Sequence, residues 1–137
     1  MLVSIDESDP RPIYVQIVQQ VKEQVLVGEL RDGDELPSVR ELGEALGISL
    51  HTARSAYQAL SDSGLVRIRL GKRARIAFPE PIGLAEVGGE DLSEEAHDLV
   101  VDSLLRGLSR TEIHDLVDGE IDRITARRAE ATEGSRS

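Results

Sequence analysis

The stretch that decides the fold runs from Leu36 to Val66 and reads LPSVRELGEALGISLHTARSAYQALSDSGLV. Ser38 and Glu41 have the spacing of a capping box, in which each side chain satisfies a free backbone N–H at a helix start. Gly47 ends this helix, and Ser49, two residues later, is suited to cap the next one. Two short helices joined by such a tight turn predict a helix-turn-helix, and the second of them is the candidate recognition helix.

The second helix of this motif has an apolar face and a polar face. At 100° per residue, its buried face is predicted to hold Ala53, Ala56, Tyr57 and Leu60. The opposite face carries His51, Ser55 and Gln58, with Thr52 and Arg54 on its flanks. The helix is therefore expected to pack on one side and to present hydrogen-bonding groups on the other.

A helix precedes this motif and a β-hairpin follows it. Pro12 suits the first turn of a helix, and Gly28 ends it. Its apolar stripe comprises Ile13, Tyr14, Ile17, Val18, Val21 and Val25. Beyond Gly64 apolar and polar residues alternate on both sides of Gly71–Lys72, which predicts two strands and a turn. Residues 1–78 are thus predicted to form a winged helix-turn-helix.

The rest of the chain is predicted to be helical. Residues 79–91 are rich in proline and glycine and are interpreted as a linker, and residues 129–137 as a flexible tail. Helices are expected within 92–128, with a second capping box at Ser109 and Glu112. Their apolar positions, which we assign to dimerisation, are Leu99, Leu104, Ile113, Leu116, Val117, Ile121 and Ile124.

Two helices of this size cannot bury such a surface alone. They need the winged domain, another chain, or both. The predicted fold class is therefore mostly α with a small β-hairpin: a winged helix-turn-helix followed by a short two-helix dimerisation region.

Charge is distributed unevenly along the 137 residues. The net charge of −10 at first argues against a nucleic-acid partner, but residues 1–79 carry 10 basic and 11 acidic side chains and residues 80–137 carry 6 and 15. The segment 67–75 holds five basic residues and no acidic one. Charges beyond a Debye length of about 8 Å are screened, so DNA responds to this local surface rather than to the total.

Composition excludes several other classes of protein. There is no cysteine, so a disulfide framework, a thiolate zinc site and a thiol nucleophile are absent. No apolar run approaches the ~20 residues of a membrane span, and the acidic residues before Pro10 do not resemble a signal peptide. A cytoplasmic protein with no membrane partner is expected.

Several spaced motifs resemble the GntR family of bacterial transcription regulators. They are Pro12–Tyr14, Gly28–Leu30, Leu36–Leu42, Gly47–Ser49, Thr52–Arg54, Tyr57–Leu60 and Gly64–Val66. The resemblance covers roughly residues 10–78. The short helical remainder is similar to the YtrA subfamily, in which such helices mainly dimerise, and is too short for the effector or aminotransferase-like domains of other branches.

The resemblance implies DNA-contacting roles for particular residues. Arg40 matches an arginine that reaches DNA from the helix before the recognition helix, and Gly71 matches the glycine of the wing tip. Ser49, His51, Thr52 and Arg54 match the start of the recognition helix. Two positions depart from the family pattern: Leu50 is often arginine or proline in relatives, and Arg73 stands where a second wing glycine is common.

The predicted DNA-binding residues are Ser38, Arg40, Ser49, His51, Thr52, Arg54, Ser55, Arg67, Arg69, Gly71, Lys72 and Arg73. Arg54 suits a bidentate contact with guanine, and a phosphate contact is an equal alternative. The basic hairpin is interpreted as binding phosphate or the minor groove, although basic residues also protect sheet edges.

The other polar groups favour simpler interpretations. His114 and Asp118 have the i,i+4 spacing of a metal pair, but three scattered histidines without cysteine indicate surface residues. Nothing accompanies the acidic helices as a nucleophile or phosphate loop. We therefore expect neither an enzyme nor a cofactor.

Together these patterns predict a homodimeric regulator, a repressor, that binds an inverted-repeat operator in double-stranded DNA. The alternative is a winged-helix protein-interaction module without specific DNA binding. The sequence leaves open whether a small-molecule effector binds between the C-terminal helices, and it does not identify the operator or the regulated genes.

Overall fold

The computed structural model describes residues 1–78 and 92–134, with side chains as far as 131. The chain divides into two compact units, formed around Met1–Pro79 and Glu80–Arg127, and each is described by itself. The predicted linker, 79–91, lies outside the described residues.

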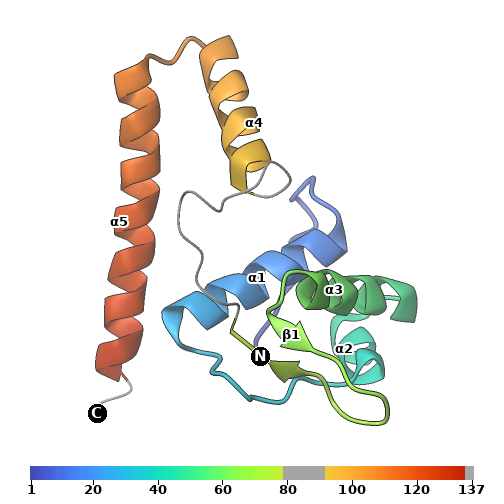
Figure 1. Cartoon of the computed structure of the whole chain (residues 1–137). Helices are drawn as coiled ribbons and strands as arrows, with labels where there is room; N and C mark the ends of the chain where they lie inside the picture. Colours follow the sequence, from blue (N-terminus) through green and yellow to red (C-terminus); the bar gives the residue numbers. More distant parts are fainter. Residues whose placement is uncertain (79–91, 135–137) are drawn as a thin grey trace. The chain divides into compact units, whose positions relative to one another are not determined.

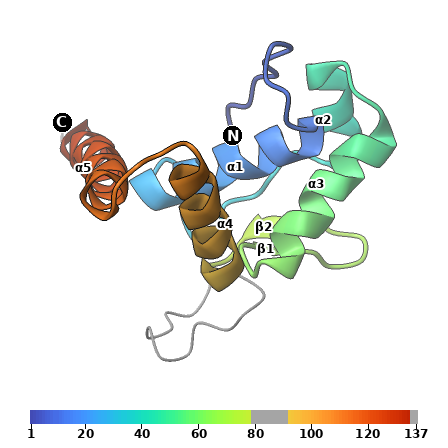
Figure 2. The same ribbon diagram turned by 90° about the horizontal axis from the view of Figure 1, so that it is seen from above.

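Three helices and a hairpin form the first unit (Figures 1 and 2). The helices are α1 (Ile13–Val27), α2 (Val39–Leu46) and α3 (Leu50–Asp62), and α3 packs against both α1 and α2. The largest fully buried side chains of this unit are Ile17, Val21, Leu36, Leu60 and Ile76. The helix α3 is thus the central element of the core, which fixes the orientation of its outer face.

Both predicted N-caps of the helix-turn-helix are present. The Ser38 hydroxyl accepts a hydrogen bond from the Glu41 N–H (3.1 Å), and the Glu41 carboxylate accepts one from the Ser38 N–H (3.2 Å). Ser49 accepts from the Thr52 N–H (3.1 Å). Between the helices Gly47 adopts the left-handed conformation (φ 66°) that L side chains avoid, so the turn can stay short.

The hairpin is shorter than the alternation predicts. Its strands are β1 (Val66–Arg67) and β2 (Arg75–Ile76), paired antiparallel with Val66 opposite Ile76 and Arg67 opposite Arg75. Val66 and Ile76 are buried, whereas Ile68 is half-exposed and Leu70 is fully exposed. The apolar alternation fails there because the hairpin extends beyond the core that its root covers.

The loop before α2 lies along the other edge of β2. The Gly33 N–H donates to the Ile76 carbonyl, the Ile76 N–H to the Asp34 carbonyl, and the Leu36 N–H to the Ala74 carbonyl, each at 2.8 Å. These bonds attach the root of the hairpin to the segment that leads into the helix-turn-helix.

A feature that the sequence analysis missed is an N-terminal strap, residues 1–6, held on α1 by three glutamines. Gln16, Gln20 and Gln24 occupy successive i,i+4 positions, and each side-chain amide binds both the backbone N–H and the backbone C=O of one strap residue. These residues are Asp6, Ser4 and Leu2, respectively. The odd-numbered side chains, Met1, Val3 and Ile5, pack against the core instead.

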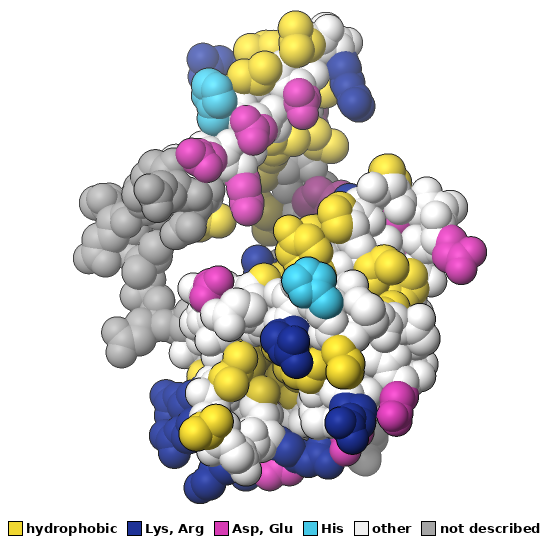
Figure 3. All heavy atoms as spheres, turned by 90° about the vertical axis from the view of Figure 1, so that its right-hand side faces the viewer, with side chains coloured by type: hydrophobic (Ala, Val, Ile, Leu, Met, Phe, Trp, Pro, Cys, Tyr) yellow, Lys and Arg dark blue, Asp and Glu magenta, His cyan; other side chains and the backbone are white. Residues whose placement is uncertain are grey.

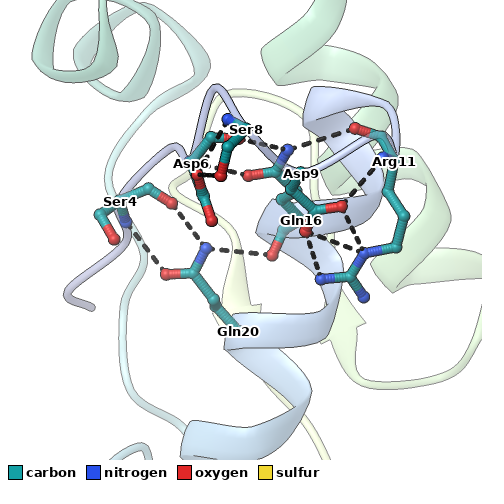
Figure 4. A network of polar contacts seen from close by, with 7 residues as sticks. All are labelled: Ser4, Asp6, Ser8, Asp9, Arg11, Gln16 and Gln20. Atoms are coloured by element: carbon teal, nitrogen blue, oxygen red, sulfur yellow. Dashed lines mark hydrogen bonds and ion pairs between the residues drawn. The ribbon is translucent and has the colours of Figure 1, made fainter.

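Figure 4 shows two of these glutamines, Gln16 and Gln20, and the turn that follows the strap. The Gln20 amide accepts from the Ser4 N–H (3.0 Å) and donates to the Ser4 carbonyl (2.7 Å). In the turn, the Asp9 carboxylate accepts from the Arg11 guanidinium at 2.7 Å. These hydrogen bonds lower the pKa of Asp9 below its ordinary value.

The buried face of α1 differs from the predicted apolar stripe. Ile17, Val18 and Val21 are buried as predicted, but Ile13 and Tyr14 are more than one-third exposed. Gln16 and Gln24 are buried instead, because the strap covers the side of α1 that carries them.

The second unit holds α4 (Leu92–Leu105) and α5 (Arg110–Gly134) as far as Arg127. The predicted capping box is present: the Ser109 hydroxyl accepts from the Glu112 N–H, and the Glu112 carboxylate from the Ser109 N–H, each at 3.1 Å. α5 continues to Gly134, so it extends into the segment predicted to be a flexible tail. None of the helices within 1–78 and 92–134 has the length and apolar character of a membrane span.

Most of the predicted dimerisation side chains are exposed in this unit. Leu99, Leu104, Leu116, Val117 and Ile121 are exposed, and Ile124 is partly buried. Ile113 differs, since only 9% of it is exposed. It is already covered within the chain, so it is not available on the surface as the sequence analysis expected.

Candidate nucleic-acid interface

The outer face of α3 carries exposed polar side chains near its N-terminus. His51 and Arg54 are exposed, and neither has a hydrogen-bonding or ionic partner within the described residues. The Ser49 and Thr52 hydroxyls instead hydrogen-bond each other (2.9 Å), and the Gln58 amide donates to Asp62 (2.9 Å). His51 and Arg54 are therefore exposed side chains of this face whose donors are free for an external ligand.

A groove of about 570 Å³ separates α3 from the hairpin. Its walls come from three elements: Arg54, Tyr57 and Gln58 on α3, Ser38 and Val39 at the start of α2, and Ile68 with Gly71–Ala74 on the hairpin. Residues predicted from separate motifs thus meet around one concave surface, which combines cationic groups with the N-terminal end of a helix.

Tyr57 fixes the wall of this groove. Its hydroxyl donates a 2.5 Å hydrogen bond to the Pro37 carbonyl, and burial raises the pKa of Tyr57 above its ordinary value of 10.0. The phenol is therefore a neutral donor at physiological pH. The sequence identified Tyr57 as a core residue, and nothing local in it identified Pro37 as the partner.

Arg73 is paired with a carboxylate of α2. Its guanidinium donates two hydrogen bonds to Glu41, from Nη1 to Oε2 (2.7 Å) and from Nη2 to Oε1 (2.5 Å). The pair lowers the pKa of Glu41 and raises that of Arg73. Glu41 therefore has a second role besides the predicted cap, because it connects the hairpin to the helix-turn-helix.

The outer face of the hairpin holds a second hollow, of about 300 Å³. Its basic lining residues are Arg67, Arg69, Lys72, Arg73 and Arg75, and Asp32 is its one carboxylate. Arg75 donates to Glu35 (2.6 Å) and to the Gly33 carbonyl (2.9 Å). Arg67, Arg69 and Lys72 have no side-chain partner in the described part of the chain.

Figure 3 shows the side of the molecule on which α3 and the hairpin lie in Figure 1. Lys and Arg side chains gather toward the lower end of the winged unit, and a histidine lies near the centre of its face. At the tip of the hairpin Gly71 has φ 74° with open space around it. Arg40 is exposed on α2, outside both hollows.

Predicted site residues therefore fall into three groups. Ser38, Arg54, Gly71, Lys72 and Arg73 line the groove, whereas Arg67 and Arg69 line the outer hollow, which Lys72 and Arg73 also line. Arg40, Ser49, His51, Thr52 and Ser55 line neither hollow. Within residues 1–78 and 92–134 no three His, Cys, Asp or Glu side chains cluster as a metal site would require.

A helix-turn-helix with a basic hairpin beside its second helix defines a winged-helix DNA-binding protein. The chain belongs to the GntR family: the model of "Bacterial regulatory proteins, gntR family" matches residues 13–76. The chain is 31% identical over 116 residues to the HTH-type transcriptional repressor YtrA of Bacillus subtilis, covering 85% of this chain and 89% of that one. The family consists of transcriptional regulators, not enzymes.

Solved structures agree with this assignment. A transcriptional antiterminator from Listeria monocytogenes EGD-e is 31% identical with a TM-score of 0.76, over 90% of this chain and 92% of that chain. The DNA-binding domain of AraR in complex with operator ORX1 shares the fold, with a TM-score of 0.50 at 23% identity, over 56% of this chain and 99% of that chain. The first likeness extends through both units, whereas the second covers about half of the chain.

Proposed function

We propose that this protein is a homodimeric transcriptional repressor that binds an inverted-repeat operator in double-stranded DNA. The groove between α3 and the hairpin carries the proposal, because its rim presents unpaired basic groups from both elements. An α-helix fits the major groove, and a hairpin beside it reaches the adjoining backbone or minor groove.

The proposed DNA contacts are of two kinds, to base edges and to the phosphate backbone of DNA. His51 and Arg54 are placed to reach base edges because they are exposed and unpaired on α3. Arg40, Lys72 and the N-terminal end of α2 at Ser38 are suited to phosphate. Ser49, Thr52 and Ser55 add hydroxyls along the same helix, and Gly71 lets the backbone of the wing tip approach DNA.

The exposed apolar surface of α4 and α5 supports the dimer. Leu99, Leu104, Leu116, Val117 and Ile121 leave a surface on the second unit that a globular monomer would normally cover. A second copy supplies the same surface with two-fold symmetry. The half-sites of the operator are then about one helical turn apart, ~34 Å, and the protein acts in the cytoplasm, where DNA is accessible.

Fluorescence anisotropy of the labelled upstream region of the protein's own gene, with random duplex of equal length as control, tests the proposal. We expect tight binding to the upstream region at two chains per site and a steep loss of affinity with salt, because phosphate contacts release counterions. Absence of binding to either duplex at low salt would exclude DNA and leave protein docking as the function of the winged unit.

A further inference from the structure

Leu50, the first residue of α3, is an exposed leucine at the end of the helix that carries unpaired polar groups. The other two large hydrophobic side chains of this helix, Tyr57 and Leu60, are buried in the core, whereas 45% of Leu50 is exposed. His51, which follows it, is exposed and has no hydrogen-bonding or ionic partner within the described residues. An apolar contact surface therefore lies beside the groups that we assign to base edges.

Leu50 shares one side of α3 with Arg54. The two residues are four positions apart, so their side chains lie one helical turn apart on the same side. Arg54 is exposed, is unpaired within the described part of the chain and lines the groove beside the hairpin. One turn is about 5.4 Å, or one to two base-pair steps of about 3.4 Å. A base pair close to the one that Arg54 contacts is therefore within reach of Leu50.

Gly43 on α2 limits the freedom of the Leu50 side chain. A Cβ atom at position 43 would lie 3.2 Å from the Ile48 carbonyl oxygen and 3.7 Å from Leu50 Cδ2. The absence of a side chain at Gly43 thus leaves room for one side of Leu50 against a buried part of α2, while the other side stays exposed. Leu50 is therefore partly fixed before binding, and burial of its exposed side costs little side-chain entropy.

A leucine side chain distinguishes base edges by the groups that it leaves unpaired, since it has no hydrogen-bonding group of its own. Against guanine, adenine or cytosine it would remove water from N7, O6 or an amino group without replacing the lost hydrogen bond, which costs free energy. Thymine is the base that presents a methyl group in the major groove. Contact with this methyl removes apolar surface from water on both molecules, which is favourable.

We propose that Leu50 contacts the methyl group of a thymine, and that each half-site of the operator has an A·T pair in the corresponding orientation at this position. The inference rests on the proposed function, which places α3 in the major groove. Arginine, which is often found at this position in relatives, would instead suit guanine. The leucine therefore changes the base that is recognised rather than the placement of the helix.

Selection of bound duplexes from a random-sequence pool tests this base preference. Wild-type protein should enrich thymine at one position of each half-site. Leu50→Ala should lose the preference at that position alone, and Leu50→Arg should replace it with guanine. The matched control is Leu26→Ala, which truncates a leucine of α1 that is also 45% exposed and should leave the selected site unchanged. Identical sites for wild type, Leu50→Ala and Leu50→Arg would overturn the inference.

A second measurement isolates the methyl group and needs no substitution in the protein. Deoxyuridine in place of thymidine at the selected position removes only the methyl, and should weaken wild-type binding about fourfold per half-site, the effect of one buried carbon group. With a C·G pair at that position, 5-methylcytosine should bind more tightly than cytosine. Leu50→Ala should show neither difference in anisotropy titrations. Equal wild-type affinity for the thymidine and deoxyuridine duplexes would contradict the contact.

Failure of this contact and failure of the proposed function give different results. Wild-type protein that enriches no sequence and binds no duplex at low salt contradicts the proposed function, and the inference falls with it. Wild-type protein that selects a defined site in which no thymine depends on Leu50 contradicts only the inference. Thermal unfolding of Leu50→Ala and Leu26→Ala checks that the fold persists, as expected for side chains that are nearly half exposed.

Discussion

Arg73 on the hairpin and Glu41 on α2 form a two-point ion pair, with oxygen–nitrogen distances of 2.7 and 2.5 Å. The same carboxylate accepts the Ser38 N–H at the helix start. One side chain thus joins the first turn of the helix-turn-helix to the wing. In the family pattern the position of Arg73 is commonly glycine, which has no side chain for such a link.

We expect Arg73→Ala to weaken operator binding a few-fold without changing its salt dependence. Glu41 already neutralises the guanidinium, so the side chain positions the wing rather than releasing a counterion. Anisotropy titrations between 50 and 200 mM salt measure both quantities. A slope lower by about 0.9 per protomer would instead show that Arg73 leaves Glu41 and contacts phosphate.

Glu41→Gln should lower the thermal unfolding midpoint at neutral pH and lose this effect in acid. Glutamine also suits a capping box, so the variant removes the charge while keeping the cap. The pKa of Glu41 is lowered in the folded state from its ordinary 4.5 by Arg73. Its stabilising contribution is therefore present above pH 4.5 and is lost as the pH falls through the folded pKa.

The measurement is the difference in melting temperature between wild type and Glu41→Gln from pH 7 down to pH 3. The gap should narrow as wild-type Glu41 becomes protonated. A gap that stays constant through this range would mean that the cap geometry, not the ion pair, causes the loss.

Arg54→Ala should reduce binding to the operator far more than binding to random duplex. A bidentate contact with one base pair contributes about 1–3 kcal/mol of discrimination. Parallel titrations of both duplexes at one salt concentration give the ratio directly. An equal loss on both would make Arg54 a phosphate contact and remove it from base recognition.

Tyr57→Phe should destabilise the winged unit by about 1 kcal/mol, the typical net value of one hydrogen bond. The Pro37 carbonyl loses its donor, while the aromatic ring keeps its packing. Urea unfolding measures the change, and Tyr14→Phe is the matched control because Tyr14 is exposed. Equal effects of the two substitutions would contradict a specific role for the Tyr57 hydroxyl.

Gln20→Ala should destabilise the protein by about 1–2 kcal/mol, because two hydrogen bonds to Ser4 are lost. Hydrogen exchange at the Ser4 amide should also accelerate. Gln19→Ala is the control: the same residue type, one position away and exposed. If Ser4 exchange is unchanged by Gln20→Ala, the strap is held by its apolar side chains alone.

Local chemistry explains which features the sequence predicted. The caps at Ser38, Ser49 and Ser109 depend on residues three positions apart, and all three are present. The helix α3 was predictable because its apolar period is regular, and its predicted buried residues agree with the structure. The proline and glycine content after Phe78 predicts a linker, and that segment lies outside the described residues.

Contacts between distant residues explain what the sequence did not predict. The pairs Arg73–Glu41 and Arg75–Glu35 join residues 32 and 40 positions apart, and no spacing rule indicates them. The basic run was recognised as one cluster, but its division between the groove and the outer hollow depends on strand register. The burial of Gln16 and Gln24 depends on a strap that has no periodic signal of its own.

The side-chain amides of the three glutamines of α1 bind backbone N–H and C=O groups of the strap. Every residue except proline has both of these groups. The pairing therefore places no demand on the side chains of Leu2 and Ser4, since these residues contribute only backbone to it. The number of residues between the strap and α1, by contrast, is not free to vary. Removal of a single residue between Asp6 and Pro12 would shift the strap by one position along α1. Its apolar side chains would then face water, and each glutamine amide would meet the backbone of a neighbouring strap residue. In this part of the protein, the backbone pairing therefore constrains the length of the chain more than the side chains at positions 2 and 4.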